Sequence, residues 1–136
     1  MDRKRKEISD VKKAEEVIKS LDTDKYGNIK LTKNQIRKFL GAVNAITNRV
    51  DIYFSQHQDE KNIPLDLVNQ IEFLKVKLAY QAGRDKHGKV VKDFVEKADL
   101  MNRIDDIGDD LTRYRNFAQY IEALVAYHRY YGGNDN

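Results

Sequence analysis

Residues 114–133, YRNFAQYIEALVAYHRYYGG, decide the fold class of this chain. Large side chains recur in this stretch at spacings of three and four residues, which is the pattern of one buried face of an α-helix. That face consists of Tyr114, Phe117, Ile121, Leu124, His128 and Tyr131. Gly132 and Gly133 follow, and glycine is the commonest residue just after a helix. The stretch therefore predicts a long helix that ends at the paired glycines.

The same spacing predicts four more helices towards the N-terminus. One runs from about Val90 to a stop near Gly108, and another begins near Pro64 and closes at Gly83. A third begins at Thr32, where Gln35 three residues later completes a capping box, and it stops before the polar run 55–62. The first helix carries its apolar face on Ile8, Val11, Ala14, Ile18 and Leu21.

The remaining segments are predicted to be loops and tails. Residues 22–31 hold Gly27 and Asn28 and are predicted to be a turn, and no segment alternates apolar and polar residues as a half-buried strand does. The prediction is an all-α, single-domain bundle of about five helices over residues 1–136. Residues 1–7 are interpreted as a disordered basic tail and residues 133–136 as a polar tail.

Composition excludes several classes of protein. The 136 residues include no Cys, which excludes disulfide scaffolds, thiolate metal sites and cysteine nucleophiles. The longest apolar run, Ala123–Tyr127, is far shorter than the roughly 20 residues of a membrane-spanning helix. We expect a cytoplasmic protein that needs no cofactor.

Charge is unevenly distributed along the chain. Residues 22–58 carry six basic and three acidic side chains, whereas residues 90–112 carry three basic and seven acidic ones. This asymmetry favours a subunit with one surface towards a polyanion and another that repels it or meets a basic neighbour.

Two segments look like ligand-binding loops but lack decisive residues. Residues 22–33 resemble a calcium loop, yet Tyr26 and Lys33 stand where oxygen ligands are required. Residues 83–90 are one residue from a phosphate-binding loop, but Val90 has no hydroxyl for magnesium. Both are interpreted as ordinary loops, and no metal site is predicted.

The chain has few candidates for catalytic residues. The histidines are His57, His87 and His128, and the closely spaced aspartates are Asp105, Asp106, Asp109 and Asp110. The first two histidines lie in polar loops, and the third lies on a helix face that is predicted to pack. The aspartates flank a helix end, where the helix dipole stabilises their negative charge. We therefore predict no catalytic site.

Basic residues lie on two predicted helix faces. On the second helix Lys33, Arg37, Gly41, Asn44 and Asn48 form one stripe, in which Gly41 would let another backbone come close. On the third helix basic and aromatic residues alternate on the side away from the apolar face, at Phe73, Lys77, Tyr80 and Arg84. Cations contact phosphates and aromatic rings stack on bases, so this face suits RNA or single strands. Packing of Phe73, Val76 and Tyr80 against another helix of the bundle is the alternative.

Three segments in order resemble the small subunit of type III-A CRISPR effector complexes, the Csm complexes. They are LTKNQIRKFL at 31–40, LKVKLAYQAGR at 74–84 and IEALVAYHRYYG at 121–132. The resemblance implies a non-catalytic RNA-binding subunit, present in several copies that stack along the duplex of guide RNA and target RNA. It also implies two kinds of partner, a large palm-domain subunit and a repeated backbone subunit, which carry the chemistry.

The resemblance also implies roles for particular residues. The candidate phosphate ligands are Arg37, Lys38, Lys75, Lys77 and Arg84, and Tyr80 joins them from the periodicity of the third helix. Glu122, Tyr127 and His128 are implied to hold the bundle together.

Two other functions remain open. One is a homo-oligomeric assembly or adaptor protein whose basic stripes meet residues 90–112 of a neighbour without touching RNA. The other is a small helical nuclease that uses His57 and His128.

Overall fold

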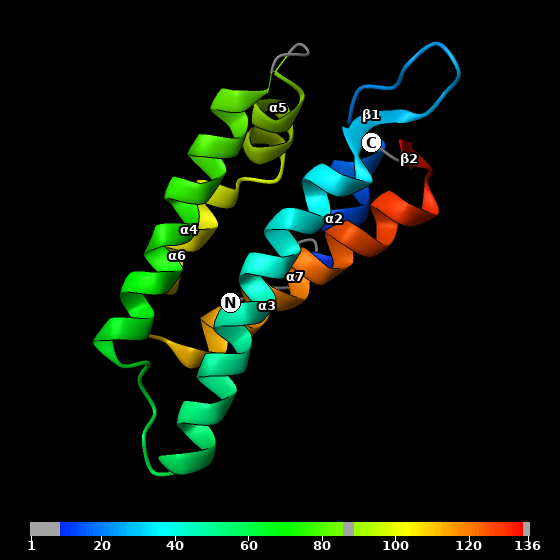
Figure 1. Cartoon of the computed structure of the whole chain (residues 1–136). Coiled ribbons are helices and arrows are strands. Elements are labelled where there is room, and N and C mark those ends of the chain that lie inside the picture. Colours follow the sequence, from blue (N-terminus) through cyan, green and yellow to red (C-terminus); the bar gives the residue numbers. More distant parts are fainter. Residues whose placement is uncertain (1–8, 86–88, 135–136) are drawn as a thin grey trace, which may run out of the picture.

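The computed structural model describes residues 9–85 and 89–134, and within them it confirms an all-α bundle (Figure 1). The described helices are α2 (Asp10–Lys19), α3 (Lys33–Gln56), α4 (Leu65–Arg84), α5 (Val90–Lys97), α6 (Leu100–Ile107) and α7 (Leu111–Tyr130). Two short strands accompany them, β1 (Ile29–Thr32) and β2 (Gly133–Asn134). None of the described helices is long and apolar enough to cross a membrane. The basic tail predicted at 1–7 lies outside the described residues.

The long helices α3 and α4 begin where the sequence predicts. The Thr32 hydroxyl accepts a hydrogen bond from the Gln35 backbone N–H at 3.0 Å, and the Gln35 side chain accepts one from the Thr32 N–H at 2.9 Å. This reciprocal pair satisfies two N–H groups that a helix start leaves unbonded. Pro64 directly precedes α4, and its carbonyl accepts from the N–H of Val68.

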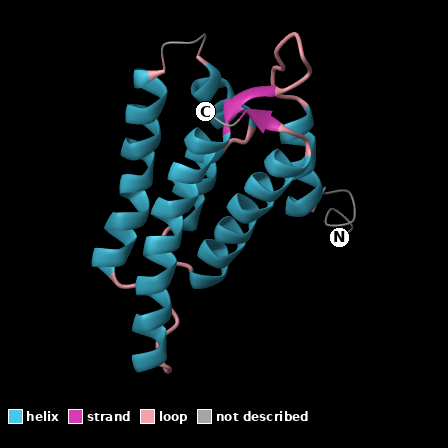
Figure 2. Ribbon diagram, turned by 45° about the vertical axis from the view of Figure 1, so that its right-hand side comes forward, coloured by secondary structure: helices cyan, strands magenta, loops and turns pink. Residues whose placement is uncertain are grey.

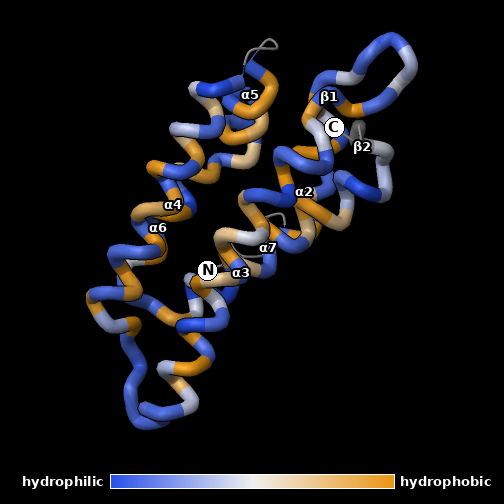
Figure 3. The backbone as a smooth tube through the Cα atoms, in the orientation of Figure 1, coloured by the Kyte–Doolittle hydropathy of each residue, from blue (hydrophilic) through white to orange (hydrophobic). Residues whose placement is uncertain are grey.

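Helix α7 buries most of the face that its spacing predicts. Its buried residues are Tyr114, Phe117, Tyr120, Ile121, Leu124 and His128. The helix packs against α2, α3 and α6, and Figure 3 shows apolar positions recurring along the helices. The segment that decides the fold class therefore supplies one side of the core.

The N-terminal helix uses a slightly different face from the predicted one. Ala14, Ile18 and Leu21 are buried as expected, but Val11 is 56% exposed and Val17 is buried instead. Ile8 lies outside the described residues. The prediction was wrong at Val11, which stands in the first turn of α2 and faces solvent.

The single helix predicted over about 90–108 is two helices, α5 and α6. Asp99 between them has a φ of 57°, a left-handed conformation that ends α5. The Ala98 carbonyl accepts a hydrogen bond from the buried Tyr120 hydroxyl at 3.0 Å, so the interruption is stabilised from α7. Apolar side chains continue across the break, which is why spacing alone did not reveal it.

The predicted turn at 22–31 and the predicted polar tail at 133–136 both contain strand residues. Strand β1 pairs in parallel with β2, and the Ile29 N–H bonds the Gly132 carbonyl at 3.3 Å (Figure 2). Ile29 and Leu31 are buried on this side of the bundle. The prediction of a turn was wrong over 29–31, because a strand pair this short has no alternating pattern to read and β1 pairs with residues at the far end of the sequence.

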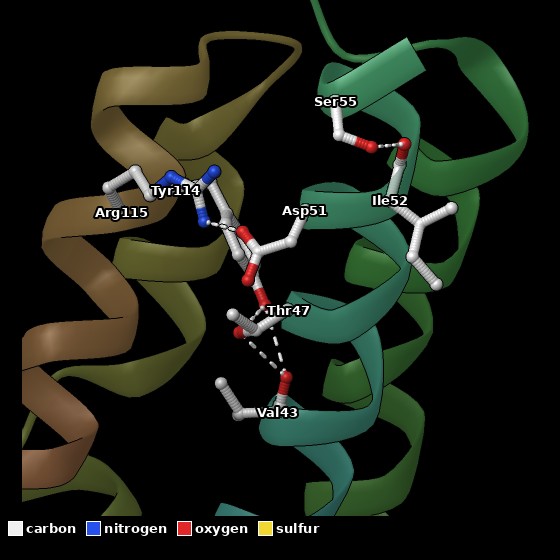
Figure 4. Close-up of polar contacts among 7 residues, drawn as sticks. All are labelled: Val43, Thr47, Asp51, Ile52, Ser55, Tyr114 and Arg115. Carbon is white, nitrogen blue, oxygen red and sulfur yellow. Dashed lines mark hydrogen bonds and ion pairs between the residues drawn. The ribbon is translucent and has the colours of Figure 1, made fainter.

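Polar contacts fix α3 against α7. The Tyr114 hydroxyl lies 2.7 Å from the Thr47 hydroxyl and donates to the Val43 carbonyl at 3.1 Å, while Arg115 pairs with Asp51 (Figure 4). Burial raises the pKa of Tyr114, so the phenol stays protonated and able to donate. These contacts set the position of α3, one wall of the site described next.

Candidate nucleic-acid interface

Helices α3 and α4 enclose a shallow groove on the outside of the bundle. The Gln81 side chain of α4 donates to the Gln35 carbonyl of α3 at 2.7 Å and ties the two helices together at one end. The groove here has a volume of about 450 Å³. Its lining comprises Lys38, Phe39, Ala42, Phe73, Val76, Lys77, Tyr80, Gln81 and Arg84.

A second hollow of about 310 Å³ extends the groove towards the other end of the helices. It shares Ala42, Phe73 and Lys77 with the first and adds Arg49, whose guanidinium bonds the Gln70 side chain at 2.6 Å. We call the two hollows together the α3–α4 groove.

Four cations line the α3–α4 groove, and no carboxylate is found among the described residues that line it. The cations are Lys38, Arg49, Lys77 and Arg84. All four side chains are exposed, so their charge is available to a ligand. A wall with cations and no anions attracts a polyanion such as RNA.

Aromatic and aliphatic side chains stand open to solvent between these cations. Phe73 is 54% exposed, Val76 51% and Tyr80 67%. The Arg84 guanidinium carbon lies 5.5 Å from the centre of the Tyr80 ring, within the range of a cation–π contact. The alternative in which these side chains pack inside the bundle is therefore wrong, because they face solvent.

The structure brings together four of the six predicted site residues. Lys38, Lys77, Tyr80 and Arg84 all line the α3–α4 groove. Two predicted residues lie elsewhere, and each has its own surroundings.

Lys75 faces α6 rather than the groove. Its ammonium pairs with Asp105 of α6 and, at 3.0 Å, with Glu72. These carboxylates, Asp105 foremost, raise the pKa of Lys75 and offset its charge. Lys75 thus holds α4 against α6.

Arg37 is exposed on α3, on the stripe that also holds Gly41, and it does not line the α3–α4 groove. A Cβ atom added at Gly41 would meet no atom within 4 Å. Within the described chain, therefore, Gly41 is not a point of close helix packing.

Sequence reasoning missed Arg49 as a site residue. Lys38, Ala42, Ala45 and Arg49 follow each other at spacings of four, three and four, so they share one face of α3. That pattern was available, but only the position of α4 shows that this face borders Lys77.

The histidines are not placed to act as an acid–base pair. His128 is buried, and its Nε2 lies 2.6 Å from the Leu31 carbonyl, just before the start of α3. Burial lowers the pKa of His128, which favours the neutral ring. His57 follows the other end of α3, about 36 Å away for a helix of 24 residues, and stacks on Tyr53. His87, like the rest of 86–88 in the loop that resembles a phosphate-binding motif, lies outside the described residues.

Two of the aspartates considered above stabilise a helix start and a turn. Asp110 caps α7 by accepting from the Arg113 N–H at 2.9 Å, as predicted for an aspartate at this helix end. In the loop that resembles a calcium motif, the Asp24 carboxylate accepts from the N–H groups of Tyr26 and Asn28, which makes this segment an Asx turn. In the described part of the chain, no three His, Asp or Glu side chains lie close enough to hold a metal ion.

Comparison with known proteins adds a family. The family model described as Csm2 Type III-A matches residues 5–134. A Streptococcus thermophilus protein named CRISPR system Cms protein Csm2 is 39% identical over 125 residues, which cover 92% of this chain and 93% of that protein. A protein of the same name from Mycobacterium tuberculosis (strain CDC 1551 / Oshkosh) is 32% identical over 93% of this chain and 94% of its own length. Another from Enterococcus italicus is 30% identical over 77% of this chain and 71% of its own length.

Proposed function

The chain belongs to the Csm2 type III-A family of CRISPR proteins, and on that premise we propose that it is a non-catalytic, RNA-binding small subunit of a type III-A complex. Its α3–α4 groove contacts the phosphates of the duplex of guide RNA and target RNA. The observation that carries this proposal is the line of four cations in a groove whose described lining has no carboxylate.

The dimensions of the groove suit a backbone-tracking contact. Helix α4 has 20 residues and is therefore about 30 Å long. Positive charge is distributed along this length by Arg49 on α3 and by Lys77 and Arg84 on α4. Contacts from these side chains to phosphates do not depend on the base sequence of the RNA. Such a surface reads RNA by its phosphates.

Assembly with other subunits is the second part of the proposal. Several copies stack along the duplex, and the large palm-domain subunit and the repeated backbone subunit are the other partners. Residues 90–112, with seven carboxylates, lie on α5, α6 and the start of α7 rather than along the groove. This arrangement leaves the acidic side of the chain free to contact other protein subunits or to repel the phosphates of the RNA.

The experiment places a Lys77→Ala/Arg84→Ala variant in the assembled complex and measures its affinity for target RNA. We expect normal assembly and weaker RNA binding, since exposed charges contribute little to folding but much to phosphate binding. The matched control is Lys12→Ala/Arg129→Ala, which removes the same two charges from the exposed faces of α2 and α7.

Two results would contradict the proposal. In the first, the groove variant and the control bind target RNA equally well. In the second, the groove variant fails to assemble and the isolated wild-type chain shows no salt-dependent binding of RNA, which is the behaviour of an adaptor without direct RNA contact.

A further inference from the structure

The floor of the α3–α4 groove is apolar, which phosphate contacts do not require. Phe39 and Ala42 form its base, and Phe73, Val76 and Tyr80 stand along one wall. The last three are each more than half exposed. Leaving such side chains in water forgoes the stabilisation that burial would provide, so they favour a ligand with an apolar surface.

A regular duplex does not present such a surface to this groove. Its bases are stacked inside, and its outer edge offers phosphates and ribose hydroxyls. Those phosphates could be bound by Lys38, Lys77 and Arg84 alone, without any aromatic ring. The apolar wall therefore indicates nucleotides whose bases are not stacked in a helix.

Charge selects RNA over a protein helix as the occupant. A nucleotide carries both a flat apolar base and a negative phosphate, and the groove supplies an exposed ring with cations on either side of it. Arg84 lies against the Tyr80 ring at 5.5 Å, and Lys77 is one helical turn away on the same wall. Phe73 and Tyr80 are seven residues apart, about 10 Å along α4, so the wall offers two successive rings.

We infer that the α3–α4 groove binds an unpaired stretch of RNA, with a base stacked on Tyr80 and the adjoining phosphates held by Lys77 and Arg84. This inference rests on the proposed function, because it assumes that the groove faces RNA. It narrows the RNA that the groove contacts from the duplex as a whole to a stretch of that guide RNA or target RNA whose bases are unpaired.

The test compares two single strands of equal length, an oligouridine, whose bases stack little on one another, and a ribose–phosphate strand without bases. Both carry the same phosphates, so the ratio of their affinities isolates the contribution of the bases. For the wild-type full chain we expect the oligouridine to bind about fivefold more tightly or better, the usual worth of one base stacked on an aromatic ring. In Tyr80→Leu this preference should decrease, because only the Phe73 ring remains on that wall, while affinity for the strand without bases is unchanged. In Tyr80→Phe the preference should persist.

Tyr26→Leu is the matched control. Tyr26 is 77% exposed and has the Lys25 ammonium 5.3 Å from its ring, so it presents the same chemistry outside the groove. Its replacement should leave the preference for bases intact. Melting curves of all variants check that they fold.

The inference fails if wild type binds both strands equally, or if Tyr80→Leu shows the same preference for bases as wild type. Equal binding with a normal salt response would retain phosphate recognition and assign the apolar wall to a protein helix. Absence of salt-dependent binding to either strand would instead overturn the proposed function itself.

Discussion

Removing Lys77 and Arg84 should halve the dependence of RNA affinity on salt. Each phosphate contact on a single strand contributes roughly 0.7 to the slope of log affinity against log salt. With all four groove cations engaged, the wild-type slope is about −2.8, and with Lys38 and Arg49 alone it is about −1.4. Between about 50 and 200 mM salt the wild type should therefore lose about 50-fold in affinity and the variant about sevenfold.

The control variants for this prediction are Lys75→Ala and Arg37→Ala. Both residues have the charge and the sequence context of a phosphate ligand, but Lys75 pairs with Asp105 and Glu72, and Arg37 lies outside the groove. Neither change should alter the slope. Fluorescence anisotropy with a labelled oligouridine at several salt concentrations measures all the slopes under one set of conditions.

The result that would refute the reasoning is specific. If Lys75→Ala lowers the slope as much as Lys77→Ala does, the face of α4 towards α6 binds RNA and the assignment to the groove is wrong. A slope that stays near the wild-type value in Lys77→Ala/Arg84→Ala would also show that the assignment to the groove is wrong.

Three further predictions concern stability. The pKa of buried His128 is lowered, so the unfolded chain binds a proton before the folded chain does as the pH falls below about 6.5. The free energy of unfolding should therefore decline by at most about 1.4 kcal/mol per pH unit as the pH falls. Denaturant melts of His128→Gln should show a shallower decline. Gly41→Ala should raise stability by about 1 kcal/mol in thermal melts, since the added methyl meets open space in an exposed helix, and a lower melting temperature would contradict this. Tyr114→Phe should cost about 1–2 kcal/mol in urea unfolding because the Val43 carbonyl and the Thr47 hydroxyl lose a buried partner, and an unchanged midpoint would show that this bond contributes nothing.

The helices were predictable where one face stays in register over many turns. The run from Tyr114 to His128 and the capping box at Thr32 and Gln35 are local signals, and both are confirmed. The break at Asp99 was not predictable, because the carbonyl of Ala98 bonds a tyrosine 22 residues away in the sequence. The pairing of β1 with β2 depends in the same way on a contact between distant parts of the chain.

The candidate site was predictable on each helix but not between helices. Periodicity placed Lys77, Tyr80 and Arg84 on one face of α4, and the structure agrees. On α3 the predicted stripe holds Arg37, whereas the face beside α4 holds Lys38 and Arg49. Which of two neighbouring faces borders another helix depends on the packing of α3 against α4 and α7, and a single helix does not contain that information.

The most direct measurement of the central claim is ultraviolet cross-linking of target RNA to the assembled complex, followed by mass spectrometry of the cross-linked peptides. Exposed aromatic rings in contact with bases are the expected cross-linking positions, so the account predicts cross-links on α4 at Tyr80 and Phe73. Cross-links confined to α5, α6 or α7, with none on residues 69–84, would show that RNA lies on another face and would contradict the assignment of the α3–α4 groove.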